Sequence, residues 1–494
     1  MLRRVLAVLV LALAFGAVAA CGGGLEGGGE EARVQDDMPG GLPAGGEGEA
    51  ADPRFADGLP ELDFNGQVFT FLVQTEPAFR HLNDVNVEEL TGDVVLDSVY
   101  NRNRAVEERL GVVITDEQNN DAPRIIANSV AAGEARYNGV WLVVHSFFNE
   151  SLRGSFLNLH NVPHLDLEKL YWDQNAVGDM TIQGRLHGVT GDITTATHQF
   201  THLLMYNLGL GEAHGFPDLY QAVRDGAWTF DMLNSLTRDV YRDLNGSGIV
   251  DEHDFFGVEI TQAAYESFFS ASGERWIEKD AGGDIIFSDL TERKLRVLGA
   301  LEDMFTGRDS VWLNQWTGNE SWAFAEGRAI FFNADVGIMS EQSRATVEFD
   351  FGILPLPKFD AHQERYYVYA FPFFPFLSIP VTVGGADLEM TGAVFEALAA
   401  ESYRTLTPAF YDVALAHRYA RDEASHEMLD IILRSRIYDI LYWGQWDHFR
   451  HWDTGIVGML QRGGGAYVSA YERHIDRARA RIDEIMEIYA GLPY

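Results

Sequence analysis

Short apolar runs recur along the first part of the folded chain, with room for a helix between them. The runs are Gln67 to Val73, Val112 to Ile114 and Val140 to Val144, and none of them alternates with polar residues. A short run of this kind predicts a strand that is buried on both faces. We therefore expect a parallel sheet that is covered by helices on both sides.

Helical periodicity fills the gaps between these runs. Apolar positions from Leu96 to Leu110 recur at helical spacing, and Gly111 follows as a helix-ending signal. Arg124 to Glu134 predicts a second helix. In such α/β sheets ligands bind beyond the carboxyl ends of the strands. The segment His145 to Asn149, which follows the third strand, is therefore expected to lie at a ligand site.

The rest of the chain continues this alternation, which implies a second lobe. The further apolar runs are Leu186 to Asp192, Leu203 to Tyr206 and Phe349 to Leu354. The further helical stretches are Phe230 to Leu244, Leu290 to Phe305, Leu388 to Glu401 and Tyr467 to Tyr489. The last of these carries Val468, Tyr471, Ile475, Ile482 and Ile485 on one stripe, as an amphipathic helix does.

The N-terminus has the pattern of a signal peptide over residues 1–20. Arg3 and Arg4 precede an apolar run from Val5 to Phe15, which is too short to span a membrane. The small residues before Cys21 resemble the lipobox of bacterial lipoproteins, which implies a lipid on Cys21. Cys21 is the only cysteine, so the chain forms no internal disulfide. The alternative is an ordinary secreted protein that is cleaved near Ala20.

Residues 21–63 predict a tether that does not fold by itself. They are rich in Gly, Glu, Ala and Pro and hold few aliphatic residues. The whole chain has 37 basic and 74 acidic residues and a net charge of −37, which argues against a nucleic-acid binder. No glycine precedes a lysine anywhere, so a Walker A phosphate loop is excluded.

A separate segment has the spacing of a calcium loop. Its predicted oxygen ligands are Asp243, Asn245, Ser247, Ile249 through its carbonyl, Asp251 and Asp254. Ser247 and Asp254 replace the residue types that are usual at their positions, so weak or water-assisted binding is expected. The alternative is a simple polar turn. If Ca²⁺ binds here, we expect it to be structural.

Two histidines form a second motif that could bind metal. His198 and His202 have the spacing of a zinc pair on a helix, but Gln199 stands where a metalloprotease needs its glutamate base. We do not expect a zinc site.

Eight stretches in one order carry a resemblance to a known family. They are Tyr171 to Asn175, Gly191 to Ile193, Trp228 to Asp231, Phe324 to Ala329, Asp350 to Lys358, Glu389 to Gly392, Ala400 to Tyr403 and Arg436 to Asp439. Together they resemble family 1 extracellular solute-binding proteins of bacterial sugar ABC transporters, the maltodextrin-binding-like group, in its lipoprotein branch. The resemblance implies a two-lobed α/β fold of periplasmic-binding-protein type II, with a mainly parallel sheet in each lobe and a ligand cleft between them.

The resemblance also implies how the chain is divided. One lobe would comprise residues 64–196 and 378–420, and the other 203–372 and 421–494. The hinges would lie near 197–202 and 373–378. Hinge closure on a bound ligand is the expected motion.

Sugar sites pair a flat aromatic ring with carboxylates or amides around it. The candidate aromatics are Phe147, Phe148, Trp322, Tyr369, Phe371, Trp443 and Trp446, and the candidate carboxylates are Asp192 and Asp335. The alternative for the aromatics is a place in the core. For the two carboxylates it is a helix cap or a surface charge.

The expected function is capture of a sugar or oligosaccharide and its delivery to the membrane subunits of an ABC importer, without catalysis and without an organic cofactor. The chain would be a monomer anchored through Cys21 on the extracellular face of the cytoplasmic membrane. One alternative is a secreted glycoside hydrolase, which needs two carboxylates across a cleft. Another is a receptor for peptides or other solutes, because a fold does not fix its ligand.

Overall fold

The computed structural model describes residues 54–75, 84–314, 322–337, 347–371, 373–416, 423–440 and 456–492. Internal contacts divide the chain into residues 1–40 and 41–494, and the description below concerns the second unit. Within the described ranges, no helix combines the length and the apolar character needed to cross a bilayer.

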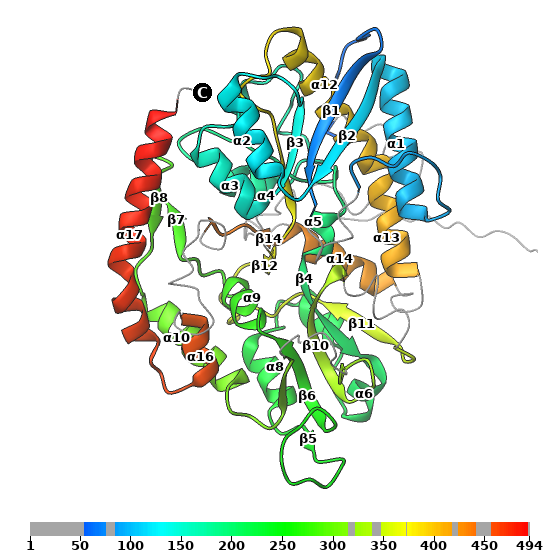
Figure 1. The fold of residues 1–494 in the computed structure, drawn as a ribbon. Helices are drawn as coiled ribbons and strands as arrows, with labels where there is room; N and C mark the ends of the chain where they lie inside the picture. Colours follow the sequence, from blue (N-terminus) through cyan, green and yellow to red (C-terminus); the bar gives the residue numbers. More distant parts are fainter. Residues whose placement is uncertain are drawn as a thin grey trace, which may run out of the picture. The chain divides into compact units, whose positions relative to one another are not determined.

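The first lobe is built on a four-stranded sheet with the order β13, β3, β1, β2 (Figure 1). Its strands are β1 (Gln67–Gln74), β2 (Val112–Asn119), β3 (Gly139–Val143) and β13 (Pro375–Ser378). β1 pairs in parallel with β2 and β3, and β13 runs antiparallel to β3. The three apolar runs at the start of the chain are therefore strands of one mainly parallel sheet, as predicted.

The helices of this lobe are α1 (Val94–Leu110), α2 (Ala122–Ala132), α3 (Val144–Leu152), the 3-10 helix η2 (Leu159–Asn161), α4 (Gln174–Met180), α12 (Ala386–Arg404) and α13 (Leu406–Ala416). α1 begins where the Asp93 carboxylate accepts the backbone N–H groups of Val95 and Leu96. It ends at Gly111, which has φ 61° and ψ 43°. The predicted helix between the first two strands is thus confirmed, together with its end.

Helices cover both faces of the first sheet. Phe395 of α12 stacks on Phe71 of β1, with ring centroids 6.0 Å apart. Phe147 of α3 stacks on Phe376 of β13 at 4.7 Å. In register, Phe71 is opposite Gly139 and Phe376 opposite Leu142, so the two aromatic contacts lie on opposite faces of the sheet. Burial on both faces explains why β3, whose five residues are all buried, carries no polar alternation. The predicted two-sided burial is wrong for β2, because this strand lies at the edge of the sheet and Val113 is exposed.

The second lobe is built on a mixed sheet with the order β11, β4, β10, β6, β5, and β9 pairs with β6 (Figure 1). Its strands are β4 (His202–Asn207), β5 (Tyr241–Arg242), β6 (Phe255–Thr261), β9 (Val311–Asn314), β10 (Ala329–Asp335) and β11 (Phe351–Leu354). β6 is parallel to β9 and β10, whereas β4 is antiparallel to β10 and β11. The expected parallel pairing therefore holds for β6, β9 and β10. It fails at β4, because this strand runs in the opposite direction to its neighbours.

The remaining elements complete the second lobe and the connections. The helices are α5 (Ala196–Gln199), α6 (Leu208–Ala213), α7 (Leu219–Arg224), α8 (Phe230–Thr237), α9 (Ala264–Ala271), α10 (Glu292–Phe305), α14 (Glu423–Arg434), α16 (Ile456–Arg462) and α17 (Tyr467–Gly491). The short strands are β7 (Ile277–Lys279), β8 (Ile285–Phe287), β12 (Val368–Tyr369) and β14 (Arg436–Ile437).

Two sequence predictions of elements need correction. The helix expected over Phe230 to Leu244 ends at Thr237, because Tyr241 and Arg242 pair with β6 as strand β5. The run Leu186 to Asp192 forms only isolated bridges, Val189 with Leu377 and Gly191 with Trp172. Its backbone passes across the end of β13 without joining the sheet as a strand.

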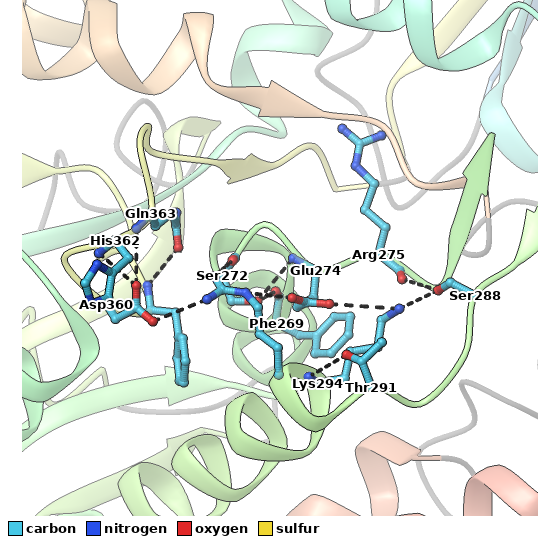
Figure 2. A network of polar contacts seen from close by, with 12 residues as sticks. Phe269, Ser272, Glu274, Arg275, Ser288, Thr291, Lys294, Asp360, His362 and Gln363 are labelled. Carbon is cyan, nitrogen blue, oxygen red and sulfur yellow. Dashed lines mark hydrogen bonds and ion pairs between the residues drawn. The ribbon is translucent and has the colours of Figure 1, made fainter. Parts of the chain in front are cut away.

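A polar network ties the start of α10 to the elements beside it (Figure 2). Arg293 pairs with Glu274 at 2.7 Å and with Asp360 at 3.3 Å. The buried Lys294 donates to the Ser288 hydroxyl at 2.5 Å. Because these partners come from three different loops, the network fixes the loops before β7 and after β11 on one helix.

This network also leads to the first lobe. The Arg275 guanidinium points away from the other labelled side chains in Figure 2. It pairs with Asp179 of α4 at 2.6 Å. Gln183 in the first lobe donates to Asp284, between β7 and β8, at 2.9 Å. The β7 and β8 hairpin therefore contacts the first lobe directly.

Candidate functional site

In both lobes the carboxyl ends of parallel strands lie next to the segments that connect the lobes. Pro375, the first residue of the antiparallel β13, is paired with Val143 at the carboxyl end of β3. His202, the first residue of β4, is paired with Asp335 at the carboxyl end of β10. Pro375 and His202 each follow directly on a connecting segment, so both carboxyl edges face the connections. This is the edge at which α/β sheets bind ligands.

Three segments lie side by side at this junction. Thr201 forms a β-bridge with Ala370, and the Phe371 N–H donates to the Phe200 carbonyl at 2.8 Å. β12 pairs in parallel with β14, whose first residue is Arg436. The junction is thus a small sheet-like crossing and not a single flexible strand.

A chain of buried polar side chains runs through the crossing. Asp173, which also caps α4, lies 2.8 Å from the Arg436 guanidinium. Arg436 Nη1 lies 3.0 Å from His198 Nδ1, and His198 Nε2 lies 3.3 Å from Asp192 Oδ1. Thr407 of α13 donates its hydroxyl to the same Asp192 oxygen at 3.0 Å. First-lobe groups, β14 and the connecting segment before β4 are therefore joined by one set of contacts.

Burial lowers the pKa of His198, and the Arg436 charge lowers it further, against the opposing effect of Asp192. His198 is therefore neutral at pH 7. A neutral ring that accepts from Arg436 at Nδ1 carries its proton on Nε2, which faces Asp192. The predicted ligand acceptor Asp192 is thus engaged in the crossing.

A second buried carboxylate ties the first lobe to the start of α5. Asp84 accepts the Thr194 hydroxyl at 3.1 Å, the Thr195 hydroxyl at 2.9 Å and the Thr195 N–H. The buried Arg102 donates to the carbonyl oxygens of Asp84 at 2.9 Å and Ile193 at 3.0 Å. Burial raises the pKa of Asp84, and the Arg102 charge opposes this rise.

Three of the predicted aromatics lie in the core. Phe147 is 2 % exposed, and Phe148 and Tyr369 are 0 % exposed. Phe147 packs on Phe156 and Phe376, and Tyr369 packs on His202 and Phe371. None of the three offers a ring face to a ligand in this conformation. Helix α3 starts directly at the end of β3, so the expected loop His145 to Asn149 is helical, with His145 exposed on it.

Of the other described candidates, Asp335 lies at the carboxyl edge of the second sheet, and Phe371 and Trp322 lie near it. Phe371 and Trp322 are half-buried, and Trp322 packs edge-on against Phe332 with ring centroids 4.9 Å apart. Asp335 is the half-buried last residue of β10. Since Phe332 and Asp335 are three positions apart on one strand, Trp322 and Asp335 lie on opposite faces of the sheet. The candidates Trp443 and Trp446, and Cys21, lie outside the described residues.

Sequence reasoning missed two groups near this edge. Glu259 of β6 is fully buried, accepts the Asn314 side chain at 2.9 Å and accepts the Phe324 N–H at 2.8 Å. His202, considered only as half of a zinc pair, is buried with no hydrogen-bond partner on Nδ1. A lone acid inside the apolar run of β6 was the available signal for Glu259. For His202 the sequence held no comparable signal.

The segment with calcium-loop spacing is closed by its own hydrogen bonds. Asp243 accepts the N–H groups of Gly246 at 2.6 Å and Gly248 at 2.9 Å. The buried Asp254 carboxylate accepts the Tyr241 hydroxyl at 2.8 Å and the Leu244 N–H at 3.1 Å. The oxygen donors are of the type that Ca²⁺ prefers, but Asp254 is engaged with protein donors in this conformation.

No group of three or more His, Cys, Asp or Glu side chains within the described ranges is placed to hold a metal ion. His198 and His202 in particular have different environments: His198 faces Arg436 and Asp192, whereas His202 lies against Tyr369 and Phe371. Burial lowers the pKa of His202 to about 3. The two imidazoles do not form the pair that zinc would need.

No protein-family model matches the sequence, and no curated protein resembles it significantly. Solved structures, in contrast, match over most of the chain. UspC of Mycobacterium tuberculosis matches with a TM-score of 0.54 at 15% identity, covering 85% of this chain and 100% of its own.

Two further structures match in the same way. An ABC substrate-binding protein of Listeria monocytogenes in complex with cycloalternan has a TM-score of 0.50 at 11% identity, over 85% of this chain and 99% of its own. UgpB of Mycobacterium tuberculosis in complex with glycerophosphocholine has a TM-score of 0.51 at 14% identity, over 79% of this chain and 96% of its own. The chain therefore has the two-lobed α/β fold of the solute-binding proteins that serve ABC transporters.

Proposed function

We propose that this chain is an extracellular receptor that binds a small solute between its two lobes and delivers it to an ABC importer. The observation that carries the proposal is that the carboxyl edges of both sheets face one crossing, in a chain with a binding-protein fold. That edge is the ligand edge of α/β sheets, and lobes joined by such a crossing can close on a ligand.

A sugar or oligosaccharide is the ligand class that fits best. Phe371 offers a partly exposed ring near the carboxyl edge of the second sheet, and Asp335 offers a carboxylate there. Phe371 lies against His202, the partner of Asp335 in register, whereas Trp322 offers a second partly exposed ring on the opposite face. Rings that cover the apolar face of a sugar and carboxylates that accept its hydroxyls are the usual combination. One structural neighbour is described with cycloalternan and another with glycerophosphocholine, so the ligand class needs a direct test.

The test is a thermal-shift screen of the mature chain over a carbohydrate panel that includes maltotetraose, with glycerophosphocholine and peptides beside it. A ligand at 100 times its Kd should raise the free energy of unfolding by about 2.7 kcal/mol. We expect a carbohydrate to give the largest shift. A larger shift with a peptide would contradict the sugar assignment, and no shift with any compound would contradict the receptor function.

Phe371→Ala provides the site-directed test. It removes a ring at the junction, so we expect at least a tenfold loss of affinity in a tryptophan-fluorescence titration. Phe216→Ala is the matched control, because Phe216 is also half-buried but packs on Tyr206 and Phe331 inside the second lobe. Equal losses in both variants would mean that Phe371 acts only through stability.

The competing hypothesis is a secreted glycoside hydrolase. The two hypotheses differ in the fate of the ligand, because a receptor returns it unchanged. Chromatography after a long incubation with the panel hit distinguishes them, and released reducing ends would favour the enzyme.

We also propose that the mature chain is anchored by a lipid on Cys21, on the extracellular face of the cytoplasmic membrane, with residues 22–53 as its tether. The tether predicted from the sequence extends too far, because residues 54–63 pack on the first lobe: Phe55 stacks on Tyr403 with ring centroids 4.0 Å apart, and Arg109 pairs with Asp57. Support comes from the signal-peptide pattern and the single cysteine. Metabolic labelling with a fatty acid should mark the wild type and not Cys21→Ser, and the variant should appear in the medium. Equal labelling of both would contradict the anchor.

The loop from Asp243 to Asp254 is proposed to bind Ca²⁺ in a structural role. Binding has to compete with the hydrogen bonds that Asp254 now accepts, so we expect weak affinity. Excess CaCl₂ should raise the melting temperature of the wild type relative to EDTA, and should not raise that of Asp243→Ala. An equal response in both proteins would contradict the site.

A further inference from the structure

Glu259 carries a buried carboxylate whose two oxygens bind different parts of the second lobe. Oε1 accepts the Asn314 Nδ2–H at 2.9 Å, and Oε2 accepts the Phe324 N–H at 2.8 Å. Asn314 is the last residue of β9, and Phe324 precedes β10. One side chain of the strand β6 therefore holds the end of one neighbouring strand and the approach to the other.

The strand register places this carboxylate on the same face as Trp322. Glu259 is opposite Phe332 in the parallel pair with β10 and opposite Trp312 in the parallel pair with β9. Partners in register share a face of the sheet. Trp322 packs edge-on against Phe332, and it lies two residues before the N–H that Glu259 binds. Glu259 thus fixes two groups. One is the backbone that carries Trp322, and the other is the Asn314 side chain at the carboxyl edge.

A buried carboxylate is a costly way to join two segments. Both of its close partners are uncharged N–H groups, and Arg328 acts on it only at longer range. Burial raises the pKa of Glu259 to about 7, in spite of the lowering by its hydrogen bonds. Well-packed apolar residues often replace buried charges without loss of stability, so stability alone does not account for a glutamate here.

We propose that Glu259 is a positioning residue for ligand binding, which sets Trp322 and Asn314 in place at the carboxyl edge of the second lobe. The proposal rests on the proposed function, because Trp322 matters only if a ligand binds at this edge. Glu259 itself is not proposed to touch the ligand. It acts on the affinity through Trp322 and Asn314.

The chemistry of the pair gives the proposal a distinctive readout. Both oxygens of ionised Glu259 accept hydrogen bonds, and both partners are donors. When Glu259 gains a proton, its O–H faces a donor, so the Asn314 amide has to turn and offer its oxygen instead. Glu259→Gln imitates this protonated state at every pH, because its NH₂ group needs the same turn of Asn314.

The first measurement needs no ligand. The fluorescence of Trp322 is obtained as the difference between each protein and the same protein with Trp322→Phe, at about pH 6 and about pH 8. We expect this difference to change with pH in the wild type and to be constant in Glu259→Gln. Asn314→Ala, which removes one donor, should also suppress the change.

Glu396→Gln is the matched control. Glu396 is a fully buried glutamate in the first lobe, and burial raises the pKa of its carboxyl to about 7 as well. It accepts the indole N–H of Trp172 at 3.1 Å and the Tyr171 hydroxyl, far along the chain from the carboxyl edge of the second sheet. This variant should retain the pH response of Trp322.

The second measurement is affinity for maltotetraose by fluorescence titration. Glu259→Gln should weaken it at least fivefold at about pH 8, whereas Glu396→Gln should not. Unchanged affinity and an unchanged Trp322 response in Glu259→Gln would overturn the proposal. If no carbohydrate binds the wild type, the sugar assignment fails, and the ligand-free signal alone decides whether Glu259 positions Trp322.

Discussion

Arg436 and His198 are 238 positions apart in the sequence, yet their side chains meet in the crossing at 3.0 Å. Arg436 also pairs with Asp173, and the side chains of both are less than a tenth exposed. Taking one partner from a buried pair leaves the other charged group without compensation. At the residue scale the crossing therefore depends on this one guanidinium.

Arg436→Met should lower the free energy of unfolding by about 3–5 kcal/mol, because it leaves the Asp173 carboxylate buried and unpaired. Urea unfolding followed by circular dichroism measures the loss. Arg224→Met is the matched control: Arg224 pairs with Glu427 at 2.7 Å, but both side chains are over a third exposed. Its removal should leave stability nearly unchanged, and a similar loss in both variants would contradict the role of the crossing.

The buried His187 makes the free energy of unfolding depend on pH. Its ring stacks on Tyr489 of α17 with centroids 5.4 Å apart, and neither ring nitrogen has a hydrogen-bond partner. Burial lowers the pKa of His187 from 6.5 to about 4. Between these pH values the unfolded chain binds a proton that the folded chain does not, so the free energy of unfolding falls as the pH falls from about 6.5 to about 4.

His187→Phe keeps a ring against Tyr489 and removes the proton-binding group. We expect the variant to gain stability over the wild type as the pH falls, by about 2 kcal/mol at pH 5, and no such pH-dependent gain above pH 7. Chemical unfolding of both proteins at the two pH values measures the difference. The expectation fails if the difference between the two proteins is the same at both pH values.

At the scale of elements, helices α1 and α2 of the first lobe both end at a glycine with left-handed backbone, but the two glycines have different surroundings. Gly111 after α1 and Gly133 after α2 both adopt left-handed backbone, with φ 61° and 70°. A Cβ on Gly133 would meet nothing within 4 Å, whereas a Cβ on Gly111 would collide with the Asp63 carboxylate. Substitution of the two glycines by alanine therefore separates the cost of backbone strain from the cost of a steric clash.

Gly133→Ala should lower the free energy of unfolding by about 1–2 kcal/mol, which is the strain of a left-handed alanine. Gly111→Ala should cost more than this, because Asp63 has to move and its hydrogen bond with the Asn65 N–H is lost. Thermal unfolding of both variants provides the comparison. Equal losses would show that the contact with Asp63 is easily relaxed.

The sequence predicted those elements whose local pattern agrees with their surroundings. The apolar runs of β1, β2 and β3 became strands that pair in parallel, and the stripe of α17 is buried at Tyr471, Ile475, Ile482 and Ile485. Burial on both faces holds for β3 but not for the edge strand β2, where Val113 is exposed. Val468 from the same predicted stripe is 38% exposed, because it lies in the first turn of the helix. The strand β5 was missed since two residues carry no periodicity and depend on pairing with β6.

At the scale of the whole molecule, the site was less predictable than the fold. Aromatic residues can be chosen for their chemistry, but Phe147 and Phe148 resemble binding residues in the sequence and lie in the core. Contacts such as Glu259 with Asn314 join residues 55 positions apart, and no local pattern encodes them. Only the arrangement of strands shows which side chains reach the carboxyl edges.

The proposed function requires a motion of the whole molecule, in which the two lobes close on a ligand at the crossing. Spin labels on Val113→Cys in β2 and Ile249→Cys in the second lobe report the separation of the lobes, because both native side chains are exposed, at 45% and 67%. Cys21→Ser removes the other thiol. The distance distribution from electron paramagnetic resonance is recorded without ligand and with the tightest carbohydrate of the panel at saturation. We predict a shorter and narrower distribution with the ligand, and a distribution that does not change at saturation would contradict closure.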